Sequence, residues 1–115
     1  MAGYTILTLN PGSTSTKIGL VRNGEVVLDQ GVEIDPAKLA GLDTYGAQAP
    51  VREQAIMDAL AAANVDLSKI DAVSGRGVGV VAVEGGTYEI NDIAYEHALH
   101  DFAGINHAAT LGIVM

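Results

Sequence analysis

Residues 10–17, NPGSTSTK, separate two short apolar segments near the start of the chain. A tight turn that contains glycine presents successive backbone N–H groups toward one point, and such a concavity binds anions. The four hydroxyl side chains add further donors, and Lys17 adds a point charge suited to phosphate. The alternative is an ordinary solvated turn, in which Ser, Thr, Asn and Gly are also common. The residue types alone leave both interpretations open.

The segments on either side of this turn predict strands. Residues 4–9 (YTILTL) and 17–22 (KIGLVR) are short and apolar, with many β-formers. Asn23-Gly24 supplies the two positive-φ positions of a tight hairpin. Residues 25–34 continue as a third strand, with Gly31 as a candidate bulge position. We therefore expect three sequential antiparallel strands.

The rest of the chain predicts helices with a further strand between them. Asp35-Pro36 is a helix-start signal, and Gly41 ends that short helix. Residues 43–50 are expected to form a loop, and Pro50 to open a longer helix that stops at Asn64. The later expectations are a strand at 70–74, an apolar segment at 78–83, a helix from Asn91 or Asp92 to about Phe102, and a helix start near Asn106. This order predicts an α/β fold with a mixed β-sheet and flanking helices.

Composition narrows the function classes. The 115 residues are about one domain, and 49% are hydrophobic, as in globular proteins. A formal charge of −8 argues against nucleic acid or an anionic membrane surface as the main partner. The absence of cysteine excludes disulfides, thiolate metal sites and cysteine nucleophiles. No stretch approaches the ~20 apolar residues of a membrane span, and we expect a cytoplasmic protein.

Three ordered motifs resemble one enzyme family. The pattern N-x-G-S-x-S-x-K between two strands resembles the first phosphate loop of the acetate and butyrate kinases, which belong to the actin-like ATPase superfamily. Residues 74–91, SGRGVGVVAVEGGTYEIN, are similar to the butyrate kinase stretch that begins G-R-G and ends G-T-Y-x-x-N. Residues 104–112, GINHAATLG, resemble the H-A-S-N-L-G segment of that family, with Thr110 in place of the asparagine. The whole chain thus resembles the N-terminal domain of a butyrate or branched-chain carboxylic acid kinase.

The resemblance implies a role for each motif residue. It implies a ribonuclease H-like domain in which Asn10 lies near Mg²⁺ and His107 and Arg76 are catalytic. Nucleotide or transferred phosphate would be bound by Gly12, Ser13, Ser15 and Lys17. The chemistry of Arg76 agrees, because a guanidinium between glycines lets a carboxylate approach and binds it bidentately.

Simpler roles remain open for these side chains. Without the resemblance, a surface ion pair is the favoured role for Arg76, and a helix cap or a core position is the favoured role for His107. His97 and His100, beside Glu96 and Asp101, raise a weaker metal-site alternative.

The implied reaction is transfer of a phosphoryl group from ATP to a short-chain carboxylate, which gives an acyl phosphate and ADP. Family members have a second domain that completes the cleft, so we expect residues 1–115 to be the N-terminal domain or most of it, and inactive alone. The remaining partners would be that C-terminal domain and, as in many enzymes, a second copy in a homo-oligomer. The segment at 78–83 lacks the lysine and proline common there in the family, and the sequence does not choose among carboxylic acids.

Two alternatives belong to other function classes. The chain would also suit the phosphate-binding half of another actin-like ATPase or a sugar kinase, although those proteins usually carry an acidic residue where Asn10 stands. It would equally suit a non-catalytic interaction module that retains the fold. Carboxylate-dependent phosphoryl transfer separates the first alternative from the kinase, and nucleotide binding at residues 12–17 separates the second.

Overall fold

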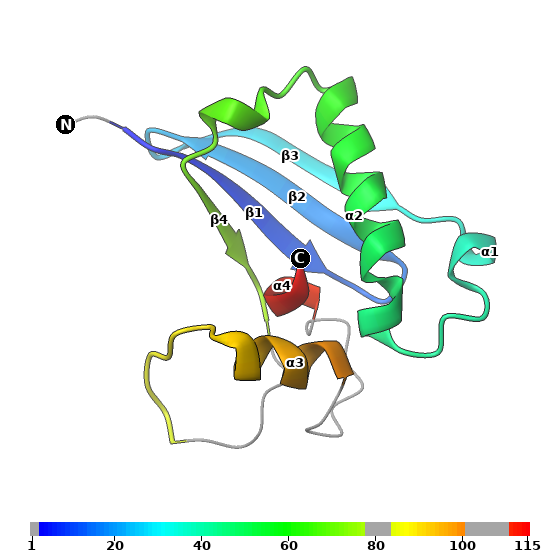
Figure 1. Cartoon of the computed structure of the whole chain (residues 1–115). Coiled ribbons are helices and arrows are strands. Elements are labelled where there is room, and N and C mark those ends of the chain that lie inside the picture. The colour runs from blue at the N-terminus through cyan, green and yellow to red at the C-terminus, as the bar shows by residue number, and fades with distance from the viewer. Residues whose placement is uncertain (1–2, 78–83, 101–110) are drawn as a thin grey trace.

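The computed structural model describes residues 3–77, 84–100 and 111–115, which form one sheet with helices around it (Figure 1). In chain order the elements are β1 (Thr5–Pro11), β2 (Ser15–Arg22), β3 (Glu25–Glu33), α1 (Pro36–Leu39), α2 (Tyr45–Ala62), the 3-10 turn η1 (Leu67–Lys69), β4 (Ala72–Gly75), α3 (Asp92–His100) and α4 (Leu111–Val114). The predicted α/β fold, with a mixed sheet and flanking helices, is confirmed over these residues.

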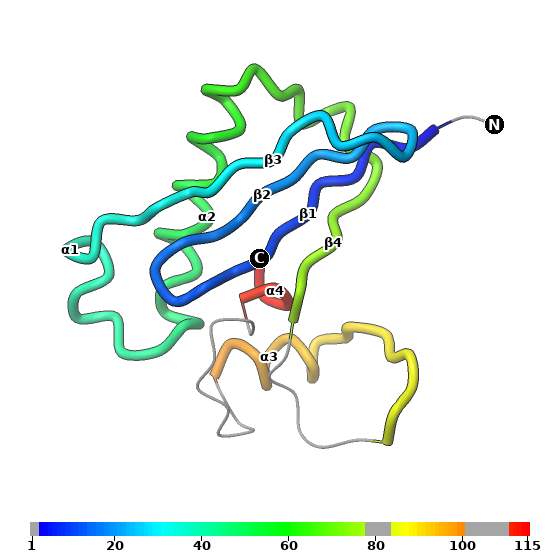
Figure 2. Tube along the Cα trace, turned by 180° about the vertical axis from the view of Figure 1, so that it is seen from behind, coloured from blue at the N-terminus to red at the C-terminus, as the bar shows by residue number. Residues whose placement is uncertain are grey.

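The sheet has the strand order β3-β2-β1-β4. β2 pairs antiparallel with both β1 and β3, as expected for a meander, whereas β4 runs parallel to β1. A parallel pair needs a long crossover, which the segment containing α1 and α2 supplies. α2 crosses one face of the sheet in Figure 1, and it lies behind the strands in the reverse view of Figure 2.

Local signals in the sequence fix three of the turns. Asn23 and Gly24 have φ angles of 53° and 80°, so the predicted hairpin turn is confirmed. The Asp35 carboxylate accepts a hydrogen bond from the Ala37 N–H at 2.9 Å, which caps α1 as expected. Asn64 has a φ of 57° directly after the C-cap of α2, where a left-handed residue is typical.

The bulge in the meander lies closer to the hairpin turn than expected. The register of β2 against β3 shifts between Leu20 and Val21, where Val27 is the extra residue. Gly31 pairs in register with Lys17, so the bulge expected there is wrong. A Cβ at Gly31 would meet no atom within 4 Å, so no close approach at this position requires glycine.

The long helix begins earlier than Pro50. The loop expected at 43–50 is wrong, because α2 starts at Tyr45 and the Thr44 hydroxyl caps it by accepting the Ala47 N–H at 3.1 Å. Pro50 therefore lies inside the helix, where its missing N–H removes one intrahelical hydrogen bond. The cap, together with burial of the first turns, outweighs that loss.

Two hydrophobic clusters hold the elements together. The first joins the sheet to α2 through Leu7, Leu9, Ile18, Leu20, Val32, Ile56 and Leu60. The second joins the start of α2 to α3 and α4 through Ala49, Ala98, Leu111 and Val114. Met115 packs against both clusters, so α4 connects the end of the sheet to the helical layer.

The later elements agree with the sequence where the structure describes them. The expected strand at 70–74 is β4, which begins two residues later and forms one edge of the sheet. Asn91 caps α3, because its side chain accepts the Ala94 N–H at 3.0 Å. The expected helix end at Phe102, the segment 78–83 and the helix start near Asn106 lie outside the described residues. Over the three described ranges, no helix is long and apolar enough to cross a membrane.

Replacing Leu60 tests the main core. Leu60 is 1% exposed, so Leu60→Ala should lower the free energy of unfolding by about 2–5 kcal/mol through the cavity it leaves. Met57→Ala is the matched control on the same helix; Met57 is 45% exposed and should show a much smaller loss. Urea denaturation measures both, and equal losses would contradict the core described above.

Candidate functional site

The NPGSTSTK turn (residues 10–17) joins the ends of β1 and β2 beside the first half of α2 (Figure 1). Within it, the Gly12 N–H donates to the Ser15 carbonyl at 2.7 Å and closes the turn tightly. A Cβ on Gly12 would lie 3.3 Å from that carbonyl, which is closer than most Cβ contacts. The Ile34 N–H donates to the Thr14 carbonyl at 3.1 Å and ties the turn to the end of β3.

A buried arginine lies directly beneath this turn. Arg52 of α2 is fully buried, and its Nη1 donates to the Gly12 carbonyl at 2.9 Å. Its Nη2 donates to the Ser13 carbonyl, and its Nε donates to Gln48 Oε1 at 3.1 Å. The Tyr45 ring lies 5.7 Å from the guanidinium carbon. Both peptide carbonyls at the tip of the turn therefore point toward α2.

The burial of Arg52 affects its charge. Desolvation lowers the pKa of Arg52 from its ordinary value, and interaction with Tyr45 partly opposes this shift. Arginine nevertheless stays protonated at neutral pH. In the part of the chain that the structure describes, its hydrogen-bond partners are neutral oxygens, and no carboxylate forms an ion pair with it. A positive charge thus lies under the turn, and no carboxylate of residues 3–77, 84–100 or 111–115 is paired with it.

The outer side of the turn presents donors. Since the carbonyls of Gly12 and Ser13 point inward, the N–H groups of the next residues, Ser13 and Thr14, point away from α2. The side chains of Ser13 and Thr14 are exposed, and their backbone N–H groups donate to no other residue within 3–77, 84–100 or 111–115. Ser15 is half-buried at the start of β2. The backbone N–H group of Gly12 is already used within the turn, so the outward donors are those of Ser13 and Thr14. Phosphate binding by Gly12, Ser13 and Ser15 stays a prediction.

Asn10 and Lys17 lie opposite each other across the turn. They are Cα partners in the β1–β2 register, so their Cβ atoms are roughly 5 Å apart. Both side chains are exposed, and they lie on the face of the sheet away from α2, because their neighbours Leu9 and Ile18 face the core. The polar amide and the ammonium group thus flank the end of the NPGSTSTK turn.

Arg76, which directly follows β4, lies near Asn10 and Lys17. Its backbone N–H donates to the Leu9 carbonyl at 2.9 Å, directly after Gly75 pairs with Leu9. Arg76 therefore lies beside Asn10, at the end of β1. The Arg76 side chain is exposed, and among the described residues no carboxylate forms an ion pair with it. Asn10 and Arg76 are far apart in the sequence, and the parallel pairing of β4 with β1 brings them together.

Glycines let α4 approach the backbone at Arg76. A Cβ on Gly75 would overlap the Gly112 carbonyl, and a Cβ on Gly112 would overlap the Arg76 carbonyl. A Cβ on Gly77 would come within 2.6 Å of the Ile113 side chain. The glycines around Arg76 therefore serve close packing against α4. This contact brings the end of the 104–112 motif to the 74–77 segment.

Thr16 differs from the other hydroxyl residues of the turn. It is fully buried on the core face of β2, where it pairs with Pro11 of β1 on one side and with Val32 of β3 on the other. Its hydroxyl is a buried oxygen without a hydrogen-bond partner in the described structure. The expectation that all four hydroxyls of the turn serve as outward donors is therefore wrong at Thr16, because strand alternation directs that residue inward.

The histidines predicted as site residues are not among the side chains that the structure places at the turn. His107, which the resemblance makes catalytic, lies outside the described residues. His100 Nε2 lies 3.0 Å from Glu96 Oε2, one helical turn away on α3. Among the residues described, no group of three or more His, Asp or Glu side chains is arranged to hold a metal ion.

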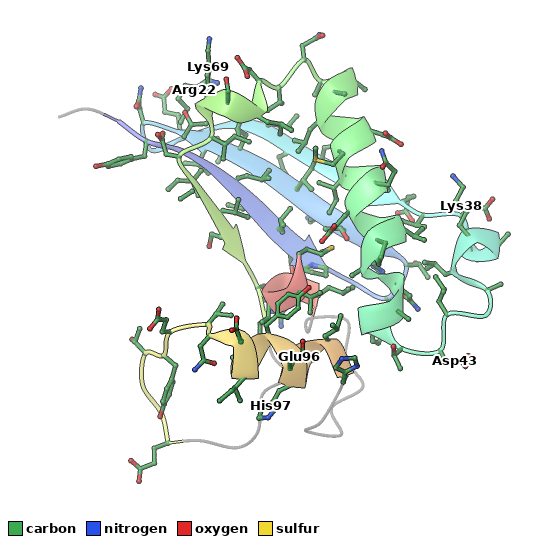
Figure 3. All side chains as sticks on the ribbon, in the orientation of Figure 1. Arg22, Lys38, Asp43, Lys69, Glu96 and His97 are labelled. Carbon is green, nitrogen blue, oxygen red and sulfur yellow. The ribbon has the colours of Figure 1, made fainter. Side chains whose placement is uncertain are left out.

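Two surface hollows lie away from these residues. A groove of about 510 Å³ between α2 and the β1–β4 edge has a mostly apolar lining that includes Leu7, Ile56 and Val73, so it offers few donors to an anion. A hollow of about 320 Å³ at the opposite end of the strands is lined by Arg22, Lys69 and Asp66, among others. Figure 3 shows Arg22 and Lys69 at that end.

The Asp66 carboxylate weakens the case for an anion at this second hollow. Hydrogen bonds from the Ser68 hydroxyl, and then from its backbone N–H, lower the pKa of Asp66, with a smaller contribution from Lys69. Asp66 therefore stays ionised at neutral pH and repels an anion from the hollow that it lines.

Replacing Thr16 tests whether its buried hydroxyl lacks a hydrogen-bond partner. Thr16→Val keeps the volume of the side chain and removes the unpartnered hydroxyl, so it should raise the free energy of unfolding by about 1 kcal/mol. Thr14→Val, at an exposed position, should change it by less than about 0.5 kcal/mol. A loss of stability in Thr16→Val, measured by urea denaturation, would show that the hydroxyl is partnered.

The close contact between Gly112 and the backbone of Arg76 predicts that a larger residue at position 112 destabilises the fold. Gly112→Ala should lower the free energy of unfolding by about 1–3 kcal/mol, because the added methyl group meets the backbone of Arg76 and Gly77. Gly85→Ala is the control, since a Cβ there meets no atom within 4 Å. Equal stability of the two variants in a denaturation experiment would argue against the close approach of α4.

No protein-family model matches this sequence. The candidate site consists of a turn whose carbonyls are held inward by Arg52, with Asn10, Lys17 and Arg76 at the ends of neighbouring strands.

Proposed function

We propose that the NPGSTSTK turn binds a phosphate group, and that this chain is the N-terminal part of an ATP-dependent short-chain carboxylate kinase. One observation carries the proposal. Arg76, from a motif far along the chain, lies beside Asn10, and Asn10 pairs with Lys17 at the end of the turn. A ribonuclease H-like domain is part of the same proposal, and the mixed sheet with flanking helices is compatible with it.

The side chains fit the chemistry of phosphoryl transfer. A carboxylate oxygen attacks the γ-phosphorus of ATP, the bond to the bridging oxygen breaks, and ADP leaves. The carboxylate is already anionic at neutral pH, so the reaction needs no general base. The protein has to position two anions and stabilise the charge on the phosphoryl group in transfer. Lys17 and Arg76 supply positive charge for that task, and Ser13 and Ser15 supply neutral donors.

The donor set also fits a nucleotide with its metal ion. Mg²⁺ keeps several waters and takes few protein ligands, since most of its remaining ligands are phosphate oxygens. The exposed amide of Asn10 offers a neutral oxygen at the edge of the turn, where it would face such a hydrated ion. When bound, Mg²⁺ would neutralise part of the phosphate charge. The role of His107 in holding the phosphoryl group is carried by the resemblance alone.

The direct test of the phosphate proposal is a nuclear magnetic resonance titration of the ¹⁵N-labelled chain. Inorganic phosphate and ATP–Mg²⁺ should each shift the amide signals of residues 12–17, with sodium chloride holding the ionic strength constant. Lys17→Met should raise the half-saturating phosphate concentration about tenfold, because a charge-assisted contact is lost. Lys38→Met, on the exposed helix α1, is the matched control and should leave that concentration unchanged (Figure 3).

The titration also separates the function classes. If neither ligand shifts these signals in the wild-type chain, the phosphate proposal fails and a non-catalytic interaction module becomes the better interpretation. Equal weakening by both lysine variants would mean that charge alone, and not the site, attracts the anion.

A second experiment tests the reaction itself. A longer protein that contains this chain and the proposed C-terminal domain should form acyl phosphate from ATP and a short-chain carboxylate, detected as a hydroxamate after trapping with hydroxylamine. Arg76→Ala should abolish the product, and the 115 residues alone should form none. Transfer to a sugar without transfer to a carboxylate would support another member of the actin-like ATPases. Turnover by the 115 residues would contradict the two-domain proposal.

A further inference from the structure

We propose that Arg52 is a positioning residue, which holds the NPGSTSTK turn in its anion-binding conformation and places a positive charge behind it. This inference rests on the proposed phosphate function of the turn. Arg52 lies on α2, in a segment that none of the three motifs includes. Its role follows from its contacts.

The guanidinium group acts as a fork beneath the turn. Its two terminal nitrogens donate to consecutive carbonyls, at Gly12 and Ser13, and its Nε donates to Gln48. A peptide unit whose carbonyl points inward directs its N–H group outward, because the two groups lie on opposite sides of the planar peptide. Fixing the Gly12 and Ser13 carbonyls therefore directs the N–H groups of Ser13 and Thr14 away from α2.

The charge of Arg52 adds to this geometric effect. The side chain is fully buried, and its partners in the described part of the chain are peptide and amide oxygens, with the Tyr45 ring nearby. No carboxylate in the described ranges forms an ion pair with this buried charge, and solvent screens the field of a buried charge little. In a chain with a formal charge of −8, this cation offsets the unfavourable overall field where a phosphate would bind.

Three variants distinguish the orientation of the turn and the buried charge from a purely structural role of Arg52. Arg52→Met removes both the fork and the charge, Arg52→Lys keeps the charge without the fork, and Gln48→Leu removes one acceptor while the fork stays on the turn. Arg22→Met is the control, because Arg22 is an exposed arginine at the opposite end of β2 (Figure 3). Circular dichroism and the amide signals of Ile18 and Leu60 report whether each variant is folded.

Phosphate affinity is the main measurement, made on the whole ¹⁵N-labelled chain with inorganic phosphate. We expect the half-saturating concentration to rise about tenfold or more in Arg52→Met, to rise by a smaller factor in Arg52→Lys, and to change by less than about twofold in Gln48→Leu and Arg22→Met. In the absence of phosphate, the amide signals of Ser13 and Thr14 should move in both Arg52 variants while those of Leu60 stay in place.

Each outcome bears on the inference. Wild-type affinity in a folded Arg52→Met variant would overturn it and leave the phosphate proposal standing. No saturable phosphate response in the wild-type chain would overturn both. If Arg52→Met does not fold, Arg52→Lys decides: weaker binding with a displaced Ser13 signal supports the positioning role, and unchanged binding overturns it.

Discussion

The hydrogen bonds from the buried Arg52 guanidinium to the carbonyls of Gly12 and Ser13 are the interaction on which the candidate site depends. Removing an arginine from water costs several kcal/mol unless its N–H groups find acceptors, and here those acceptors are the carbonyls of Gly12 and Ser13 and the side chain of Gln48. The cost of burial and the conformation of the NPGSTSTK turn are therefore coupled. α2 has to lie where its arginine reaches the turn, and the turn has to direct its carbonyls toward α2.

Close packing between glycines imposes a second constraint. Gly75 and Gly77 flank Arg76, and Gly112 of α4 lies against the same backbone. A guanidinium between glycines suggests freedom for a ligand to approach, but the structure shows that a neighbouring helix uses that space. The position of Arg76 is thus determined from two sides, by the β1–β4 pairing and by α4.

The sequence predicted what depends on local chemistry. The meander, the Asn23–Gly24 turn and the Asp35 cap follow from residues close together in the chain, and each is confirmed. The start of α2 was misplaced because proline is a conspicuous signal, whereas the decisive cap was the single hydroxyl of Thr44. The buried role of Arg52 was missed, because an arginine among the polar residues of an amphipathic helix resembles a solvated one. Two features indicate it. Arg52 is three residues after Ala49 and four before Ile56, which places it on the buried face of α2, and the carbonyls of the turn need donors from that side.

The parallel pairing of β4 with β1 has a consequence for how the site assembles. Asn10 and Lys17 are brought together by a short hairpin, whereas Thr5 and Asp71, whose contact marks the same β1–β4 edge, are 66 residues apart in the chain. Closing a loop roughly ten times longer costs about 2 kcal/mol more in chain entropy. The β1–β2 pairing can therefore form within a short stretch of chain, whereas Arg52 and Arg76 reach the turn only with the crossover between β3 and β4. Mutations that weaken the crossover would then remove both arginines from the site and leave the strand pairing of the hairpin.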